Sequence, residues 1–134
     1  MPEFLDYTSI QPEIDAVALL QYHAGVSVDM MYGPNASGAY SYHVPIAMLY
    51  CFRYECDLYT TYLDNLDGGI VEWENLLRES FDRGEPLYYA AFGSDGAHAF
   101  VCSGYDDNNL FHFNWGWQGF DNGYYAIDNF YLTY

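Results

Sequence analysis

The spacing of apolar residues predicts three helices in the first part of the chain. The first spans residues 12–23, where apolar side chains return every three or four positions and Pro12 suits the first turn. Gly25 is expected to end this helix. The second helix runs from residue 44 to about 52 and the third spans 70–82. Each of these carries one apolar stripe, so we expect each helix to pack one face against a core.

The segments between these helices have the composition of connections. Residues 26–32 are short and are expected to be extended. Residues 33–38 contain Gly, Pro, Asn and Ser, which is the composition of a loop, and residues 64–69 are expected to form a turn.

The second half of the chain has the pattern of strands. Residues 86–92 are a continuous apolar run, predicted to be a buried strand. Residues 97–105 and 110–117 flank a polar turn, which predicts a β-hairpin. Residues 123–127 are expected to form a last short strand. Helices followed by an antiparallel sheet indicate an α+β fold.

Composition and charge narrow the classes of partner. The chain has 134 residues, of which 51% are hydrophobic and 16% charged, so it suits one domain or part of one and is not a disordered chain. Three Arg and no Lys stand against 19 Asp and Glu, giving a net charge of −16. Such a chain would be repelled by nucleic-acid phosphates and by anionic membranes. No run of about 18 apolar residues predicts a membrane span.

The three cysteines are poor candidates for chemistry. An odd count is not a disulfide framework, and the spacing of Cys51 and Cys56 does not suit a zinc site. Cys51 lies on the apolar face of a predicted helix, where a thiol is usually an inert small hydrophobe. Cys102 is four residues from His98 on one predicted strand, which separates them by ~13 Å. We expect none of the three to be a nucleophile.

His98 and Asn114 are the candidate chemical pair. His98 opens an apolar strand after a glycine-containing loop, a position that suits acid–base work but also suits a structural histidine at a strand end. Asn114 lies on the next strand, where a buried amide could orient the imidazole while the nearby Trp rings shield the contact from water. Alternatively, the Trp residues are core residues and Asn114 is a turn residue.

The register of the hairpin decides between these two interpretations. A four-residue turn pairs Val101 with Asn114 and places the amide on the face away from His98. An odd turn or a single bulge pairs Asn114 with Phe100 or Cys102, and then His98 and Asn114 share a face. Asn109 tolerates a left-handed conformation and suits an odd turn. We predict the odd register or a bulge, with Asn114 aimed at His98 and a Trp ring covering the contact.

The chain resembles the streptopain family of papain-like bacterial cysteine peptidases. The strand that contains His98, combined with the segment Asn114-Trp115-Gly116-Trp117, is highly specific. The resemblance covers nearly the whole chain and is weakest over residues 53–70. The segments that carry it are residues 25–30, 32–34, 37–39, 84–89, 96–101, 104–105, 111–119 and 122–125.

This resemblance implies a papain-like fold, consisting mainly of the histidine-bearing antiparallel sheet subdomain plus helices, with residues 1–134 as a single partial domain. It implies that His98 is the catalytic general base and acid, that Asn114 orients it and that Trp115 shields it. The substrate would be a polypeptide, with no metal or organic cofactor. The family is secreted, although residues 1–6 lack the pattern of a signal peptide.

Some residues depart from the family pattern. Ala97 and Gln118 stand where glycine is usual. The family's nucleophilic cysteine sits in a Gly-Cys-Val-Ala-Thr-Ala-like segment, and no such segment is present here. We therefore expect this chain to be inactive alone and its partner to be the missing N-terminal half of the peptidase domain or its pro-segment. The alternatives are a non-catalytic pseudo-peptidase or protein-binding module and, less well supported, an acidic carbohydrate- or calcium-binding domain.

Overall fold

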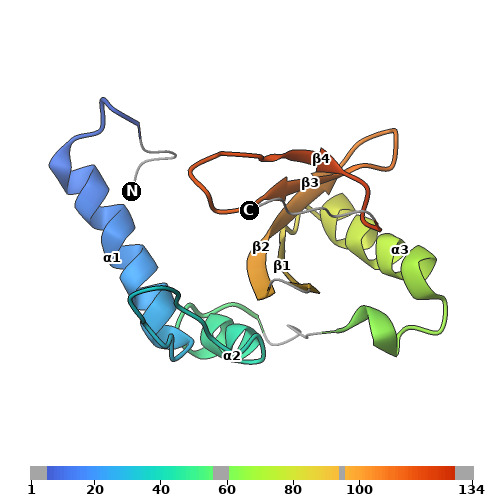
Figure 1. Cartoon of the computed structure of the whole chain (residues 1–134), viewed down its shortest axis with the longest axis horizontal. Coiled ribbons are helices and arrows are strands. Elements are labelled where there is room, and N and C mark those ends of the chain that lie inside the picture. Colours follow the sequence, from blue (N-terminus) through green and yellow to red (C-terminus); the bar gives the residue numbers. More distant parts are fainter. Residues whose placement is uncertain (1–5, 56–60, 94–95, 129–134) are drawn as a thin grey trace. The chain divides into compact units, whose positions relative to one another are not determined.

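The computed structural model describes residues 6–55, 61–93 and 96–128. The chain divides into two units, Met1–Thr60 and Thr61–Tyr134. Helices α1 and α2 belong to the first unit, and helix α3 with strands β1 to β4 belongs to the second (Figure 1). Among the described residues, no helix is long and apolar enough to cross a lipid bilayer.

The first unit is built on helices α1 (Gln11–Ser27) and α2 (His43–Tyr50). At the start of α1 the Glu13 carboxylate accepts a hydrogen bond from the Ile10 N–H at 3.1 Å, and Pro12 lies in the first turn as expected. The segment between the helices folds back on itself through a bridge between Met31 and Gly38. The two helices predicted for this unit are therefore present, with α2 ending two residues early.

Gly25 does not end α1, so that prediction is wrong. The glycine is buried inside the helix, and a Cβ at this position would collide with the hydroxyl group of Tyr32. Glycine is needed here because a tyrosine ring packs directly against the backbone. The helix continues to Ser27, whose hydroxyl donates to the carbonyl of Ala24 at 2.8 Å, so the extended segment expected from residue 26 begins later.

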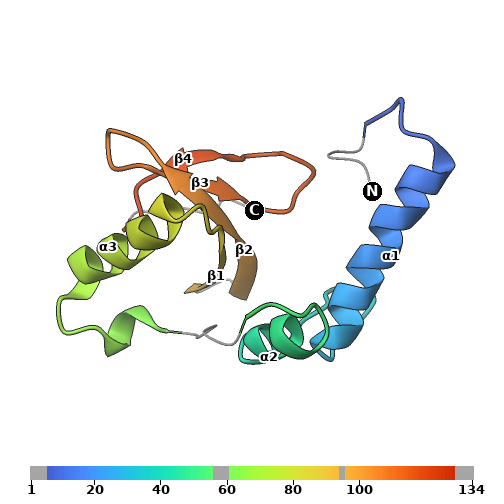
Figure 2. The ribbon, with the colours of Figure 1, turned by 180° about the vertical axis from the view of Figure 1, so that it is seen from behind.

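The second unit is a helix on a four-stranded antiparallel sheet. A short 3₁₀ turn, η1 (Leu63–Asn65), precedes α3 (Gly69–Asp82). The strands are β1 (Leu87–Gly93), β2 (Gly96–Tyr105), β3 (Phe111–Asn114) and β4 (Gly123–Tyr125), and they lie side by side in chain order (Figures 1 and 2). The α+β prediction is confirmed.

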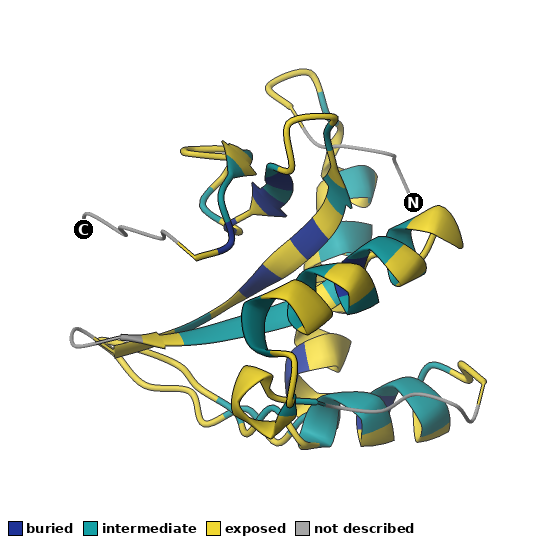
Figure 3. Cartoon of the chain, turned by 90° about the vertical axis from the view of Figure 1, so that its right-hand side faces the viewer, coloured by how far each residue is buried: buried dark blue, intermediate teal, exposed yellow. Residues whose placement is uncertain are grey.

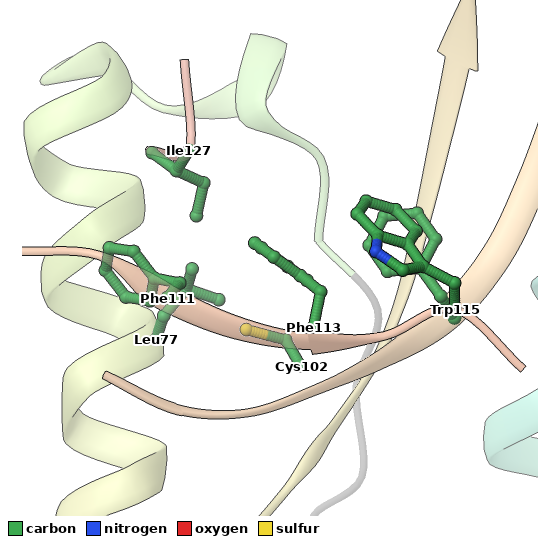
Figure 4. Close-up of a cluster of buried hydrophobic side chains, with 7 residues drawn as sticks. Leu77, Cys102, Phe111, Phe113, Trp115 and Ile127 are labelled. Carbon is green, nitrogen blue, oxygen red and sulfur yellow. The ribbon is translucent and has the colours of Figure 1, made fainter. Parts of the chain in front are cut away.

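Helix α3 packs on one face of this sheet. The buried cluster between them consists of Leu77, Phe100, Cys102, Phe111, Phe113, Trp115 and Ile127 (Figure 4). Along β2, buried positions alternate with exposed ones (Figure 3). The two buried residues of this strand are Phe100 and Cys102. On strand β1, Leu87, Tyr89 and Ala91 are partly buried against this cluster, whereas Tyr88 is 46% and Phe92 77% exposed. The prediction that this strand is buried throughout is wrong, because its apolar run supplies only one buried face.

The β2–β3 hairpin contains both of the features that can shift its register, an odd-numbered turn and a bulge. Tyr105 pairs with Phe111, so the turn has five residues, 106–110, and Asn109 is left-handed at φ 63° as expected. A bulge then shifts the register between Cys102 and Gly104. The two shifts offset each other, so Asn114 pairs with Val101. The predicted pairing of Asn114 with Phe100 or Cys102 is therefore wrong.

Burial of aromatic side chains explains this compensation. Phe111 and Phe113 are both fully buried and must face the same core as Cys102. The five-residue turn alone would pair Phe113 with Ser103, which faces away from that core. The bulge absorbs Ser103 and pairs Phe113 with Cys102.

Candidate active site

His98 lies on the core side of β2, beside its partner Ala91 on β1, and is partly exposed. Its Nε2 atom is 2.8 Å from the carbonyl oxygen of Trp115. Because a carbonyl oxygen can only accept, Nε2 must carry the proton in the neutral ring. The Nδ1 atom then keeps its lone pair. The ring is thus held in the tautomer that leaves Nδ1 able to take up a proton.

Aromatic rings fix the plane of the imidazole. The Trp117 ring stacks on His98 with centroids 4.9 Å apart and planes at 30°, and the Phe100 ring lies 5.9 Å away at 26°. Trp115 packs against both of these rings, at 4.5 Å from Phe100 and 5.9 Å from Trp117. The Trp that stacks on His98 is therefore Trp117, while Trp115 is a core residue with 3% of its surface exposed.

Asn114 does not contact His98 in this arrangement. Asn114 is exposed, and its side-chain oxygen accepts a hydrogen bond from the Gly116 N–H at 3.0 Å. This N–H belongs to the same peptide group as the Trp115 carbonyl that accepts the hydrogen bond from His98 Nε2–H. The pairing of Asn114 with Val101 places its side chain on the opposite face of the sheet from His98, so the two side chains do not meet. Asn114 is linked to the imidazole only through the peptide group between Trp115 and Gly116.

The Trp115 carbonyl is the hydrogen-bond partner of His98 that the sequence could not reveal. Every residue has a carbonyl, so no residue type marks the one that faces His98. The nearest signal is the break in the strand pattern at Gly116, where φ is 77° and β3 has already ended at Asn114. Strand β3 is accordingly shorter than the predicted 110–117.

The described thiols do not complete a nucleophile–base pair. Cys102 is fully buried in the core, and burial raises the pKa of its thiol to about 12. It is four residues along β2 from His98, as expected. Cys51 lies just after α2 and is exposed, so its predicted place on a buried helix face is wrong. Cys56 lies outside the described residues.

The other histidines have structural partners or are exposed. The His43 ring bonds through Nδ1 to the Val28 carbonyl at 2.9 Å, and His112 Nδ1 lies 2.8 Å from the Ser103 hydroxyl. His23 is exposed on α1. Within residues 6–55, 61–93 and 96–128, no three His, Cys, Asp or Glu side chains are grouped to hold a metal ion.

Comparison with known proteins identifies the family. The Peptidase C10 family matches residues 1–125. The chain belongs to the Peptidase C10 family. Streptopain of Streptococcus pyogenes serotype M28 is 34% identical over 113 residues, which are 84% of this chain and 28% of that protein. The thiol protease/hemagglutinin PrtT of Porphyromonas gingivalis is 38% identical over 123 residues, which are 90% of this chain and 13% of that protein.

Solved structures place this C10 chain in the papain-like fold. The active wild-type interpain A cysteine protease of Prevotella intermedia matches with a TM-score of 0.83 at 33% identity, covering 96% of this chain and 54% of that chain. A prointerpain A fragment from the same organism matches with a TM-score of 0.81 at 35% identity, covering 96% and 40%. The predicted family and fold are confirmed, and the C10 chain spans about a quarter of the length of streptopain.

Proposed function

We propose that this chain supplies the histidine side of a cysteine endopeptidase active site. The observation that carries the proposal is the 2.8 Å contact between His98 Nε2 and the Trp115 carbonyl, which leaves Nδ1 as the proton acceptor. Matched C10 proteins are named as thiol or cysteine proteases, which supports this chemistry. The thiol that reacts would come from a polypeptide segment other than those described here.

The proposed reaction uses Nδ1 as a proton shuttle. The thiol gives its proton to His98 Nδ1, and the resulting thiolate attacks the carbonyl carbon of the scissile peptide. As the C–N bond breaks, the imidazolium returns the Nδ1 proton to the leaving amine, and a thioester remains. Nδ1 then takes a proton from the water that attacks the thioester, which releases a carboxylic acid and the thiolate. The Nε2 proton stays on Nε2 throughout and remains hydrogen-bonded to the Trp115 carbonyl oxygen.

The neighbouring residues have supporting roles in this proposal. Asn114 fixes the peptide between Trp115 and Gly116 through its 3.0 Å hydrogen bond, so it orients His98 indirectly. Trp117 covers one face of the imidazole and keeps water from it. Trp115 supplies the carbonyl and anchors it in the core. On the family resemblance we also propose that the substrate is a polypeptide, that no cofactor is used and that the protein is secreted from the cell.

A chimera tests this proposal. Residues 1–125 of this chain, which match the family, would replace the corresponding region of streptopain, so that the chimera keeps streptopain's own upstream sequence. We expect casein hydrolysis, and we expect His98→Ala to lower kcat by at least about a hundredfold because it removes the general base and acid. Asn75→Leu, on the exposed side of α3, is the matched control and should keep the activity.

A folded chimera without turnover would contradict the proposal and favour a non-catalytic module. Near-ultraviolet circular dichroism reports whether the chimera has folded. If it has not, the same assay would be made on this chain mixed with a separately produced upstream part of streptopain. Absence of turnover from a mixture that forms a stable complex would also contradict the proposal.

A further inference from the structure

We propose that Asn122 is a positioning residue that sets the tautomer of His98 by fixing Trp115. The effect on catalysis rests on the proposed function, whereas the effect on the tautomer of His98 does not depend on it. Asn122 does not contact the imidazole. It acts on the residue whose carbonyl does.

The strand pairing on both sides of β3 ends before Trp115. The last pair of the β3–β4 ladder joins Phe113 and Gly123, so Trp115 lies beyond the regular hydrogen bonds. The loop that follows it turns sharply: residues with positive φ are Gly116 at 77°, Gln118 at 56°, Gly119 at 90° and Asp121 at 58°. A carbonyl at the start of such a loop needs another source of order if it is to hold a histidine ring.

Residues 121 and 122 supply that order. The side-chain oxygen of Asn122 accepts from the Trp115 N–H at 3.0 Å. The Asp121 carbonyl accepts from the Trp115 indole N–H at 2.8 Å and from the Tyr125 hydroxyl at 2.6 Å. The backbone and the side chain of Trp115 are thus both tied to the segment that precedes β4. Asn122 provides the backbone contact, in place of the ladder carbonyl that a longer β3 would use.

The hydrogen bond from the Trp115 N–H to Asn122 restricts the position of the Trp115 carbonyl, to which His98 bonds. Within Trp115 only the Cα atom separates the N–H that bonds to Asn122 from the carbonyl carbon. The next N–H, of Gly116, is held by Asn114. Two amide side chains therefore hold the two peptide groups on either side of the Trp115 Cα atom, and the second of these contains the carbonyl that bonds to His98. Loss of Asn122 leaves a buried N–H without its acceptor, and we expect the loop to shift to satisfy it.

A shift of the loop changes the proton on the imidazole. Without an acceptor at Nε2, neutral His98 becomes a mixture of its two tautomers, and part of the population carries the proton on Nδ1. That fraction cannot act as a base toward a thiol. A merely structural Asn122 would instead lower the stability of the fold and leave the tautomer of His98 unchanged.

The test reads the tautomer directly in the 134-residue chain. Histidine would be labelled with ¹⁵N, and long-range ¹H–¹⁵N spectra would be recorded at high pH, where the rings are neutral. His43 is an internal reference of the opposite tautomer, because its Nδ1 bonds to the Val28 carbonyl, and His23 is an exposed reference. We expect His98 to be almost entirely in the Nε2–H form.

Three variants separate the possible outcomes. In Asn122→Leu we expect His98 to move to a mixture like that of His23, whereas Asn122→Asp keeps an acceptor oxygen and should restore the Nε2–H form. Asn75→Leu is the matched control and should leave the spectrum unchanged. If Asn122→Leu fails to fold, Asn122→Ala, which removes the acceptor without adding an apolar side chain of similar size, would be measured instead. A folded variant without the acceptor whose His98 stays entirely Nε2–H would overturn the proposal.

The chimera adds a kinetic readout. There we expect Asn122→Leu to lower kcat by about tenfold to a hundredfold with little change in KM, because the base is misplaced while the substrate still binds. If the unsubstituted chimera is inactive, the proposed peptidase function fails, but the tautomer measurement still decides the role of Asn122. An active chimera whose kcat is unchanged by Asn122→Leu would overturn the positioning role.

Discussion

Asn114 lies directly across the hairpin from Val101, and this pairing separates its side chain from His98. The amide instead holds the Gly116 N–H, and the carbonyl of the same peptide holds the imidazole. The two hydrogen bonds are arranged in series, so each polarises the peptide in the direction that strengthens the other. Asn114 and His98 are therefore coupled through one peptide group without touching each other.

Asn114→Ala should remove one of the two hydrogen bonds made by the peptide group between Trp115 and Gly116. The Gly116 N–H loses its acceptor, and we expect the free energy of unfolding to fall by about 0.5–1.5 kcal/mol. Denaturant titration of the 134-residue chain measures the change. Asn75→Ala is the control on the exposed side of α3 and should change the midpoint much less. An equal loss in both variants would show that the Asn114 contact contributes nothing specific.

The thiol of Cys102 should be protected from alkylation in the folded chain. Burial raises its pKa to about 12, so at pH 8 almost no thiolate is present, and the side chain is also inaccessible. Iodoacetamide followed by peptide mass spectrometry should show modification of exposed Cys51 and not of Cys102. In denaturant both should react. Modification of Cys102 at the rate of Cys51 under native conditions would contradict the buried position.

The same raised pKa has a consequence for stability at high pH. The folded state favours the protonated thiol, so Cys102 contributes its full stabilisation below the pKa of an unfolded cysteine. That contribution is lost as the pH rises from there toward about 12. Cys102→Ala should therefore lose less stability than the unsubstituted chain between neutral and strongly alkaline pH, as measured by denaturant titration.

Asp106 should make the hairpin sensitive to acid. Hydrogen bonds to its carboxylate, first from the Leu110 N–H and then from Asn108, hold its pKa below the ordinary 3.8. Its stabilising effect is complete above the unfolded pKa and is lost as the pH falls through the lowered folded pKa. The difference in Tm between the unsubstituted chain and Asp106→Asn should shrink over that range.

Asp107→Asn is the control for this acid effect, because Asp107 is a neighbouring exposed carboxylate in the same turn. Its difference in Tm from the unsubstituted chain should vary less with pH. The role assigned to Asp106 would be wrong if the two variants gave the same pH dependence.

The 134-residue chain should not hydrolyse casein by itself. Cys102 is buried and four residues from His98 along one strand, and the sequence has no segment like that of the family's nucleophile. The assay would include a thiol-directed inhibitor. Turnover that disappears on Cys51→Ser, Cys56→Ser or Cys102→Ser would show that one of these thiols reacts and would refute the expectation.

The sequence predicted the elements and the histidine but not the contacts between them. Apolar spacing located α3 and β2 well, because one face of each is buried and the pattern has a clear period. His98 could be found because a histidine between a glycine loop and a strand is chemically distinctive. The partner of His98 could not be found, because it is a main-chain oxygen. Gly25 was misjudged because its role depends on Tyr32, a contact that helix-ending rules do not include.

The bulge at Ser103 couples the length of the 106–110 turn to the shape of β2. A turn of five residues requires one extra residue in a strand to keep Phe113 beside Cys102, whereas a turn of four requires none. Deletion of one turn residue should thus be tolerated, because the bulge can straighten and absorb it. Among relatives, insertions and deletions in this turn are expected to accompany the gain or loss of the bulge, so that natural variation in loop length leaves the histidine on the same side of the sheet.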